Sequence, residues 1–152
     1  QQTGQSVQNI KGTGAAGGIA ASLLSFFKCS MESGAGIVFN ASGMETHLQD
    51  ATLLITGEGK LDTQSGYGKV VYELTQAAMR LGIPVIALCG KVEINREQIN
   101  RYGLASAYQI ISNEVDEQMA VGDAVKLLKK LAAETIVLYT QYNQSTLRNR
   151  LI

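Results

Sequence analysis

The sequence TLLITGEGKLDTQ at residues 52–64 decides the fold class of this 152-residue chain. It opens with an apolar run that ends in glycine, which is typical of a strand buried in a parallel sheet. The remainder is polar and rich in glycine, as expected of a loop that follows such a strand. Because ligands bind at the carboxyl ends of the strands in parallel α/β sheets, this loop is predicted to lie on the functional edge.

The same alternation of strand and helix continues toward the C-terminus. Apolar residues at helical spacing are followed by Gly82 and Pro84, which are typical of a helix C-cap and of the position just beyond it. A second apolar run then ends at Gly90, as a buried strand would. The expected elements are helices over residues 70–81, 95–102 and 121–138, and strands over 84–89 and 107–111. Their order predicts an α/β fold, in which a parallel sheet is joined by right-handed crossovers and covered by flanking helices.

The first part of the chain does not continue this pattern. Small and apolar residues at helical spacing predict a helix from Ala15 to Phe27, which begins inside the glycine run GTGAAGG at residues 12–18. Residues 33–43 fit either a short strand or the start of a helix, and 44–49 indicate a short helix. The break in pattern near residue 50 predicts that the preceding segment belongs to a different lobe.

Composition excludes several classes of function. The 13 Lys and Arg residues are balanced by 13 Asp and Glu, whereas nucleic-acid binding needs a basic surface. No apolar run approaches the roughly 20 residues that span a bilayer, and the polar residues 1–6 do not form a signal peptide. The two cysteines, Cys29 and Cys89, fit no metal-ligand spacing, and Cys89 is expected to be a buried thiol. We therefore expect a reduced, cytoplasmic protein with no membrane or nucleic-acid partner.

The glycine run is the first candidate site. Gly14, Gly17 and Gly18 precede a predicted helix, where backbone N–H groups and the helix dipole favour an anion such as a phosphate or carboxylate. No strand precedes the run and no Gly-Lys-Ser/Thr follows it, so it is neither a dinucleotide-binding fingerprint nor a Walker A loop. From the residues alone, tight packing of the helix is the favoured explanation of the glycines, and anion binding is the alternative.

The loop after the first strand is the second candidate site. Glu58 and Asp62 could together hold Mg²⁺, or one of them could act as a general base. Gln64 could bind a substrate hydroxyl. Lys69 lies in the first turn of the next helix, where the helix dipole disfavours a cation, and a bound anion would explain a lysine at this position. The alternative is that the carboxylates satisfy N–H groups of the loop and that Lys69 is a solvated charge.

Other polar residues carry less information. His47 is the only histidine and is expected on the surface. A single, remote histidine does not support a Ser-His-Asp or Cys-His nucleophile constellation. Lys91 and Glu93 follow the second strand and either line the same cleft as Glu58 or are surface charges.

Three stretches of this chain resemble the bacterial glycerate kinase family: KGTGAAGGIAASLL at residues 11–24, LQDATLLITGEGKLDTQSGYGKV at 48–70 and IPVIALCGKVE at 83–93. The resemblance implies two α/β lobes with the active site in the cleft between them, and a terminal lobe of Rossmann or flavodoxin-like type. Family members are longer, so the chain, which starts with Gln1, is expected to be a C-terminal portion. Residues 1–50 would be the tail of the middle lobe, and 51–152 the C-terminal part of the terminal lobe.

The resemblance also implies a reaction, the transfer of the γ-phosphoryl group of ATP to D-glycerate with Mg²⁺ to give 2-phosphoglycerate. Such a transfer depends on positioning and charge neutralisation. Gly14, Gly17 and Gly18 would bind a phosphate or the glycerate carboxylate. Glu58 and Asp62 would be the catalytic and metal-binding carboxylates, with Asp62 favoured to act on the attacking hydroxyl. The two remaining site residues would contact substrate (Gln64) and phosphate (Lys69).

Two other functions are compatible with the sequence. The chain could fold without turnover and act as a ligand-binding or assembly module, since the resemblance places part of the active site in an N-terminal portion that is missing here. That portion would then be its main partner, and the exposed apolar surface of a truncated lobe would favour homo-oligomers. The chain could also be an unrelated α/β ligand-binding domain of flavodoxin type, which the combination of motifs disfavours.

Overall fold

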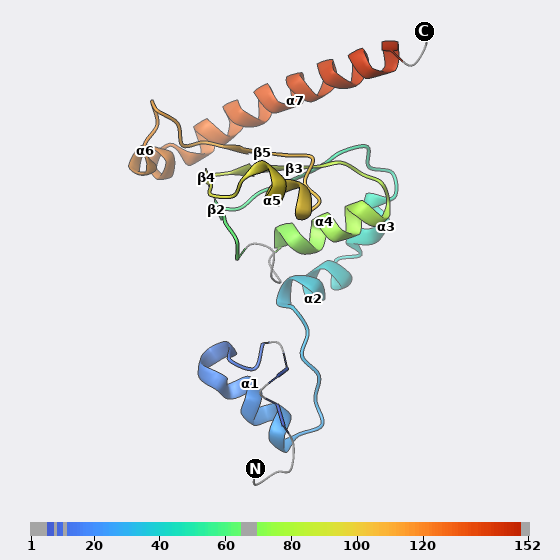
Figure 1. Ribbon diagram of the computed structural model, residues 1–152, viewed down its shortest axis with the longest axis vertical. Coiled ribbons are helices and arrows are strands. Elements are labelled where there is room, and N and C mark those ends of the chain that lie inside the picture. The colour runs from blue at the N-terminus through green and yellow to red at the C-terminus, as the bar shows by residue number, and fades with distance from the viewer. Residues whose placement is uncertain (1–5, 8, 11, 65–69, 150–152) are drawn as a thin grey trace.

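The structure is a computed structural model that describes residues 6–7, 9–10, 12–64 and 70–149, with side chains up to residue 141. Figure 1 shows the arrangement of its helices and strands. In chain order these are α1 (Ala15–Phe26), α2 (Gly34–Ala41), α3 (Met44–Leu48), β1 (Leu54–Thr56), β2 (Lys60–Leu61), α4 (Val70–Arg80), β3 (Val85–Cys89), β4 (Lys91–Val92), α5 (Arg96–Arg101), β5 (Ser106–Gln109), α6 (Glu117–Gly122) and α7 (Ala124–Asn149).

Three strands form the parallel sheet that the sequence predicts. The strand order is β1-β3-β5, with Ile55 opposite Ile86 and Ala87 opposite Ala107. α4 joins β1 to β3 and α5 joins β3 to β5, as expected for crossovers between parallel strands. Figure 1 shows α7 on one side of the sheet and α4 on the other. The prediction of an α/β fold with flanking helices is therefore confirmed.

The core lies around the central strand. All five residues of β3 are buried, because helices cover both faces of this strand and neighbouring strands cover both of its edges. From α4, Val71, Thr75 and Ala78 face the sheet at helical spacing, each at most 3% exposed. The hydroxyl of Thr75 donates to the carbonyl oxygen of Val71 at 2.6 Å, which satisfies a polar group inside the core.

The end of α4 follows the chemistry expected of Gly82. Its φ of +70° is left-handed, a conformation that glycine adopts without strain. The amides of Gly82 and Ile83 donate to the carbonyls of Met79 (3.1 Å) and Ala78 (2.9 Å), which would otherwise be unpaired at the helix end. Pro84 then leads directly into β3, so the predicted helix stop is confirmed.

The predicted long helix over 121–138 is wrong in its first turns. The chain forms two helices, and Asp123, with φ −107° and ψ 20°, separates them. α6 begins earlier, at Glu117, because the carboxylate of Asp116 accepts the amide of Met119 at 2.8 Å. This cap lies in a polar stretch outside the apolar periodicity, so the spacing of apolar residues could not predict it.

Smaller differences concern strands and the ambiguous segment. β1 is an edge strand, and Ile55 is 40% exposed rather than buried. The third strand is Ser106–Gln109 and not 107–111. The segment over 33–43 is helical, and the hydroxyl of Ser33 caps α2 by accepting the amide of Gly36 at 2.8 Å. A second, two-stranded parallel sheet of β2 and β4 was not expected at all.

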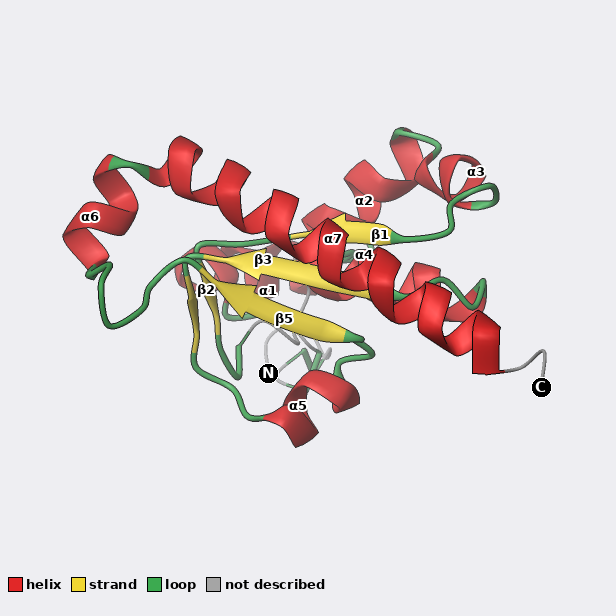
Figure 2. Cartoon of the chain, turned by 90° about the horizontal axis from the view of Figure 1, so that it is seen from above, coloured by secondary structure: helices red, strands yellow, loops and turns green. Residues whose placement is uncertain are grey.

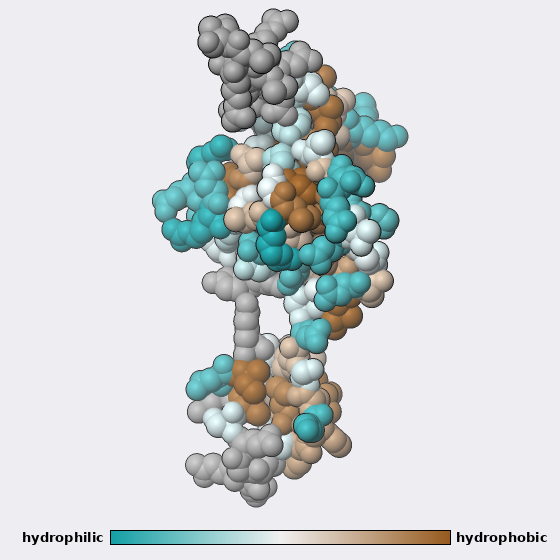
Figure 3. Space-filling view, turned by 90° about the vertical axis from the view of Figure 1, so that its right-hand side faces the viewer, coloured by the Kyte–Doolittle hydropathy of each residue, from teal (hydrophilic) through white to brown (hydrophobic). Residues whose placement is uncertain are grey.

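The N-terminal segment lies apart from this body. Figures 1 and 3 show α1 separated from the sheet, whereas α2 contacts α4 and Leu48 of α3 is part of the core. Figure 3 shows apolar surface on the separate segment, where Ile19, Phe26 and Phe27 are exposed. Within the described part of the chain, no helix combines the length and apolar character needed to cross a bilayer.

Candidate functional site

The loops that follow β1 and β3 meet at the carboxyl ends of the sheet. Gly57 lies against the carbonyl of Leu88 so closely that a β-carbon would overlap its oxygen. A β-carbon on Gly90 would lie 2.5 Å from the carbonyl oxygen of Gly59. Both glycines are therefore required by close backbone approach, and the glycine-rich loop at 57–59 has a structural reason as well as a predicted functional one.

Backbone hydrogen bonds join the two loops into one unit. The amide of Gly90 donates to the carbonyl of Glu58 at 3.2 Å, and the amide of Lys91 donates to that of Gly59 at 3.0 Å. The amide of Glu93 continues the ladder to Leu61 at 2.8 Å. β2 and β4 are the two-residue strands of this ladder. The segment after Thr56, which the sequence presents as a loop, is thus held at a fixed position against its neighbour.

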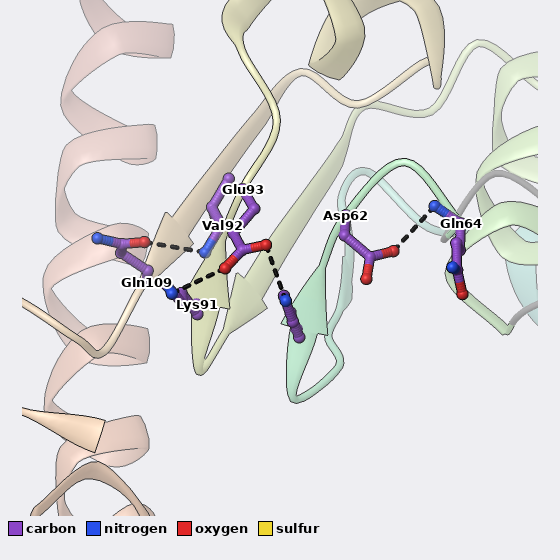
Figure 4. Close-up of polar contacts among 7 residues, drawn as sticks. Asp62, Gln64, Lys91, Val92, Glu93 and Gln109 are labelled. Atoms are coloured by element: carbon purple, nitrogen blue, oxygen red, sulfur yellow. Dashed lines mark hydrogen bonds and ion pairs between the residues drawn. The ribbon is translucent and has the colours of Figure 1, made fainter.

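Three charged side chains lie across this ladder. Glu93 pairs with Lys60 at 2.8 Å and with Lys91 at 2.7 Å, one carboxylate oxygen for each ammonium group (Figure 4). The hydrogen bond from Lys60, reinforced by that from Lys91, lowers the pKa of Glu93, and the hydrogen bond to Glu93 raises the pKa of Lys60. Lys60 and Lys91 are opposite each other in the register of β2 and β4, so Glu93 holds two cationic groups side by side.

Glu58 lies at the inner end of this ladder. It is half-buried, and its Oε1 atom is shielded from solvent. Burial raises the pKa of the nearby Cys89 thiol. The negative charge of Glu58 raises this pKa further, whereas a hydrogen bond with the backbone of Glu58 lowers it. Cys89 is therefore a buried thiol, as predicted.

Asp62 and Gln64 lie together just beyond β2. The Asp62 carboxylate accepts the backbone amide of Gln64 at 2.9 Å, a turn geometry that aspartate favours (Figure 4). The hydroxyl of Tyr102, at the end of α5, donates to the carbonyl of Thr63 at 3.0 Å and holds the turn against the body. Asp62 is half-buried and Gln64 is exposed. Lys69 lies outside the described residues.

Along the chain, Glu58 precedes β2 and Asp62 follows it directly. Within the described ranges, no group of three or more His, Cys, Asp or Glu side chains converges as a metal site would. The oxygen donors are nevertheless of the kind that Mg²⁺ prefers, and Mg²⁺ is commonly held by one or two carboxylates together with substrate phosphates and water. The chain can therefore supply part of a Mg²⁺ site, with the remaining ligands coming from the substrate.

The glycine run has an unusual backbone. Ala16, Gly17 and Gly18 all have positive φ, of 50°, 69° and 89°, so regular right-handed helix begins only after Gly18. This differs from the predicted helix start at Ala15. A β-carbon on Gly14, Gly17 or Gly18 would meet no atom within 4 Å. In this structure the requirement for glycine at the last two positions is therefore conformational, not a matter of packing.

The two candidate sites lie in separate parts of the structure. The glycine run belongs to the segment of α1, which Figure 1 shows apart from the sheet, whereas Glu58, Asp62 and Gln64 lie at the sheet's carboxyl edge. The sequence prediction also missed Lys60. Its position opposite Lys91 depends on a strand register that the apolar pattern does not reveal. His47 is exposed on α3, as expected.

Comparison with known proteins identifies the family. The model of the Glycerate kinase family matches residues 1–140, which is most of the chain. The chain belongs to the glycerate kinase family. The glycerate kinase of Halalkalibacterium halodurans is 34% identical over 148 residues, which cover 96% of this chain and 38% of that protein. The glycerate 2-kinase of Escherichia coli is 35% identical over 70% of this chain and 28% of its own length.

The fold agrees with that of a solved family member. A structure named glycerate kinase 2, from Salmonella typhimurium LT2, superposes with a TM-score of 0.63 at 31% identity. The match covers 88% of this chain and 34% of that one. The chain thus spans about a third of the length of the relatives that it matches.

Proposed function

We propose that this chain is the C-terminal portion of a glycerate 2-kinase, which transfers the γ-phosphoryl group of ATP to D-glycerate and yields 2-phosphoglycerate. The observation that carries the proposal is the family match over residues 1–140. The position of Glu58 and Asp62 at the carboxyl edge of a parallel sheet, where ligands of such sheets bind, supports it. The cytoplasm, where ATP is available, is the proposed location.

The residues of the chain have distinct roles in this proposal. Asp62 orients the attacking hydroxyl of glycerate and, with Glu58, contributes carboxylate ligands to Mg²⁺. When bound, Mg²⁺ neutralises charge on the transferred phosphoryl group. Gln64 contacts the substrate and Lys69 the phosphate oxygens. The remaining three, Gly14, Gly17 and Gly18, present backbone N–H groups to a phosphate or to the glycerate carboxylate.

The proposed lobes follow the break in the chain's pattern. Residues 1–50 would be the tail of a middle lobe and 51–152 part of a terminal lobe, with the active site between them. The separation of α1 from the sheet supports a two-lobed arrangement. α2 packs against α4 and Leu48 lies in the core, so residues 34–48 of the proposed tail contact the α/β body.

A chimera tests the proposed activity directly. The matching stretch of the Halalkalibacterium halodurans glycerate kinase would be replaced by this chain, and ADP release would be measured with ATP, Mg²⁺ and D-glycerate. Turnover that requires D-glycerate is expected, with 2-phosphoglycerate identified by ³¹P NMR. A chimera that unfolds cooperatively, and so is folded, yet releases no ADP beside an active parent enzyme would contradict the proposal.

The same assay on the isolated chain separates the two functions that the sequence leaves open. We expect no turnover, because the chain spans about a third of its relatives. An isolated chain that is inactive while its chimera is active supports the proposed role as part of a kinase. If neither is active but the isolated chain is folded, it acts as a binding or assembly module instead.

A further inference from the structure

A large cavity lies at the carboxyl edge of the sheet. Its volume is about 1100 Å³, and it separates the ends of β1 and β3 from α6 and the first half of α7. Figure 2 shows α6 and the start of α7 at the end of the sheet toward which the strand arrows point. One wall is apolar and comes from α7 (Val125, Leu128 and Ala132), and Ile55 and Ile111 also line the cavity.

The other end of the cavity is polar. Lys60 and Lys91, which Glu93 holds side by side, both line it, together with the carboxylate residues Glu58 and Glu117. The glycine-rich loop at 57–59 lines the cavity as well. The cavity therefore combines an apolar wall, carboxylate hydrogen-bond acceptors and a pair of cations at one edge of the sheet.

We propose that this cavity binds the nucleoside part of a nucleotide, with the base against the apolar wall of α7 and the phosphates toward Lys60 and Lys91. This inference rests on the proposed kinase function. Of the two substrates in that reaction, glycerate is small and polar throughout, and it would leave an apolar wall of this size uncovered. A nucleotide has a flat, largely apolar base, ribose hydroxyls that donate to carboxylates, and phosphates that attract lysines.

The ion pairs are compatible with this occupant. The side chains of Lys60 and Lys91 are 53% and 45% exposed, so incoming phosphate oxygens can reach them without disrupting the core. Exposed ion pairs of this kind contribute little to stability, so exchanging one partner costs little. A polypeptide segment would cover the apolar wall equally well but would not account for two adjacent lysines at one end of it.

Binding of ADP to the 152-residue chain tests the site without any chemical step. We would titrate the chain with ADP by calorimetry and compare Leu128→Asp with Leu138→Asp. Both leucines lie on α7 and are partly exposed, at 43% and 54%, but only Leu128 lines the cavity. A carboxylate at position 128 should weaken ADP binding about 10-fold or more, because it places a charge against the base; Leu138→Asp should leave the affinity unchanged.

A second pair of variants tests the phosphate end. Lys60→Met with Lys91→Met should weaken ADP binding while leaving adenosine binding unchanged, whereas Lys130→Met, on the exposed side of α7, should affect neither. The absence of saturable ADP binding, or equal affinities for the Leu128 and Leu138 variants, would overturn the proposal. So would concentration-dependent self-association that only Leu128→Asp abolishes, since the occupant would then be polypeptide.

These outcomes are separate from those of the proposed function. An active chimera whose KM for ATP is unchanged by Leu128→Asp would overturn the nucleotide cavity and leave the kinase activity standing. ADP binding that depends on Leu128 and the lysine pair, in a chain whose chimera transfers no phosphoryl group, would support the nucleotide cavity and contradict the proposed kinase activity.

Discussion

Gly57 lies so close to the carbonyl group of Leu88 that a β-carbon on the glycine would overlap the carbonyl oxygen. The contact joins the end of β1 to the end of β3, and it fixes where the loop with Glu58 begins. Gly57, which the close backbone contact requires, therefore lies directly beside Glu58, which is predicted to act on a substrate. Substitutions at the glycine positions test the backbone contact separately from the proposed chemistry.

Gly57→Ala should destabilise the chain. The added methyl group would force the two strands apart, and overpacking of this kind costs about 1–3 kcal/mol in free energy of unfolding. Urea denaturation followed by circular dichroism measures the change. Gly59→Ala is the matched control, because a β-carbon there meets no atom within 4 Å. Equal stabilities for the two variants would show that the strands separate without cost.

The sequence predicts the central part of the fold well for a physical reason. β3 and α4 are apolar on the faces that the sheet buries, and Gly82 and Pro84 mark the end of the helix, so local chemistry and tertiary packing agree. The division between α6 and α7 depends on a cap by Asp116 and a break at Asp123, which involve polar residues and no change in apolar spacing.

The candidate site was predictable only in part. Asp62 and Gln64 interact over two residues along the chain, so their proximity follows from a short turn. The contact between Lys60 and Glu93 joins positions 33 residues apart and depends on the register of two-residue strands in a polar segment. No apolar pattern specifies such a register, and Lys60 was missed for that reason.

Glu93→Gln should lower the pKa of Lys60 toward its ordinary value, because the hydrogen bond to Glu93 is the main cause of the rise. ¹⁵N-detected titration of the lysine Nζ groups measures the change. Glu97→Gln, on α5, is the control and should leave Lys60 unaffected. An unchanged pKa of Lys60 in Glu93→Gln would mean that the ion pair does not persist in solution.

The same ion pairs predict how stability depends on pH. The pKa of Glu93 is lowered in the folded chain, so its contribution is present above the ordinary carboxyl pKa and is lost as pH falls through the lowered value. The pKa of Lys60 is raised, so its contribution is lost as pH rises through the raised value. The stability difference between wild type and Glu93→Gln should thus be greatest near neutral pH and should decrease with added salt. A difference that persists at acid pH would contradict this.

The two cysteines should react at very different rates. Cys29 is exposed, whereas Cys89 is buried with a raised pKa, and the thiolate is the reactive form. Ellman's reagent should modify one thiol rapidly and the second only as the chain unfolds. Cys29→Ser should remove the rapid phase and Cys89→Ser the slow one. Rapid modification of Cys89 in folded Cys29→Ser would show that the carboxyl edge of the sheet opens to solvent.

Gly17→Leu tests the glycine run in the chimera. A leucine side chain would both strain a backbone with φ of +69° and cover the N–H groups that the proposal assigns to an anion. The KM for ATP or for glycerate should rise. The strain stays local, because a β-carbon at this position meets no atom within 4 Å, and circular dichroism checks that the chimera remains folded. Gly43→Leu is the control, since it too has open space and a left-handed φ, of +63°, and it lies outside the run. Unchanged KM values for both substrates would leave the run with a structural role only.

Asp62→Asn tests the proposed catalytic carboxylate in the same chimera. In the wild type, the Asp62 carboxylate accepts the amide of Gln64 at 2.9 Å. Asparagine keeps an oxygen that can accept this hydrogen bond, so the turn should persist while the negative charge is lost. If Asp62 orients the attacking hydroxyl or holds Mg²⁺, kcat should fall on the order of 10²-fold or more. Asp50→Asn, at an exposed position after α3, controls for the loss of one charge. Because the turn and the fold are preserved, a kcat equal to that of the unmodified chimera would exclude Asp62 from the mechanism and leave Glu58 as the other carboxylate of the proposed site.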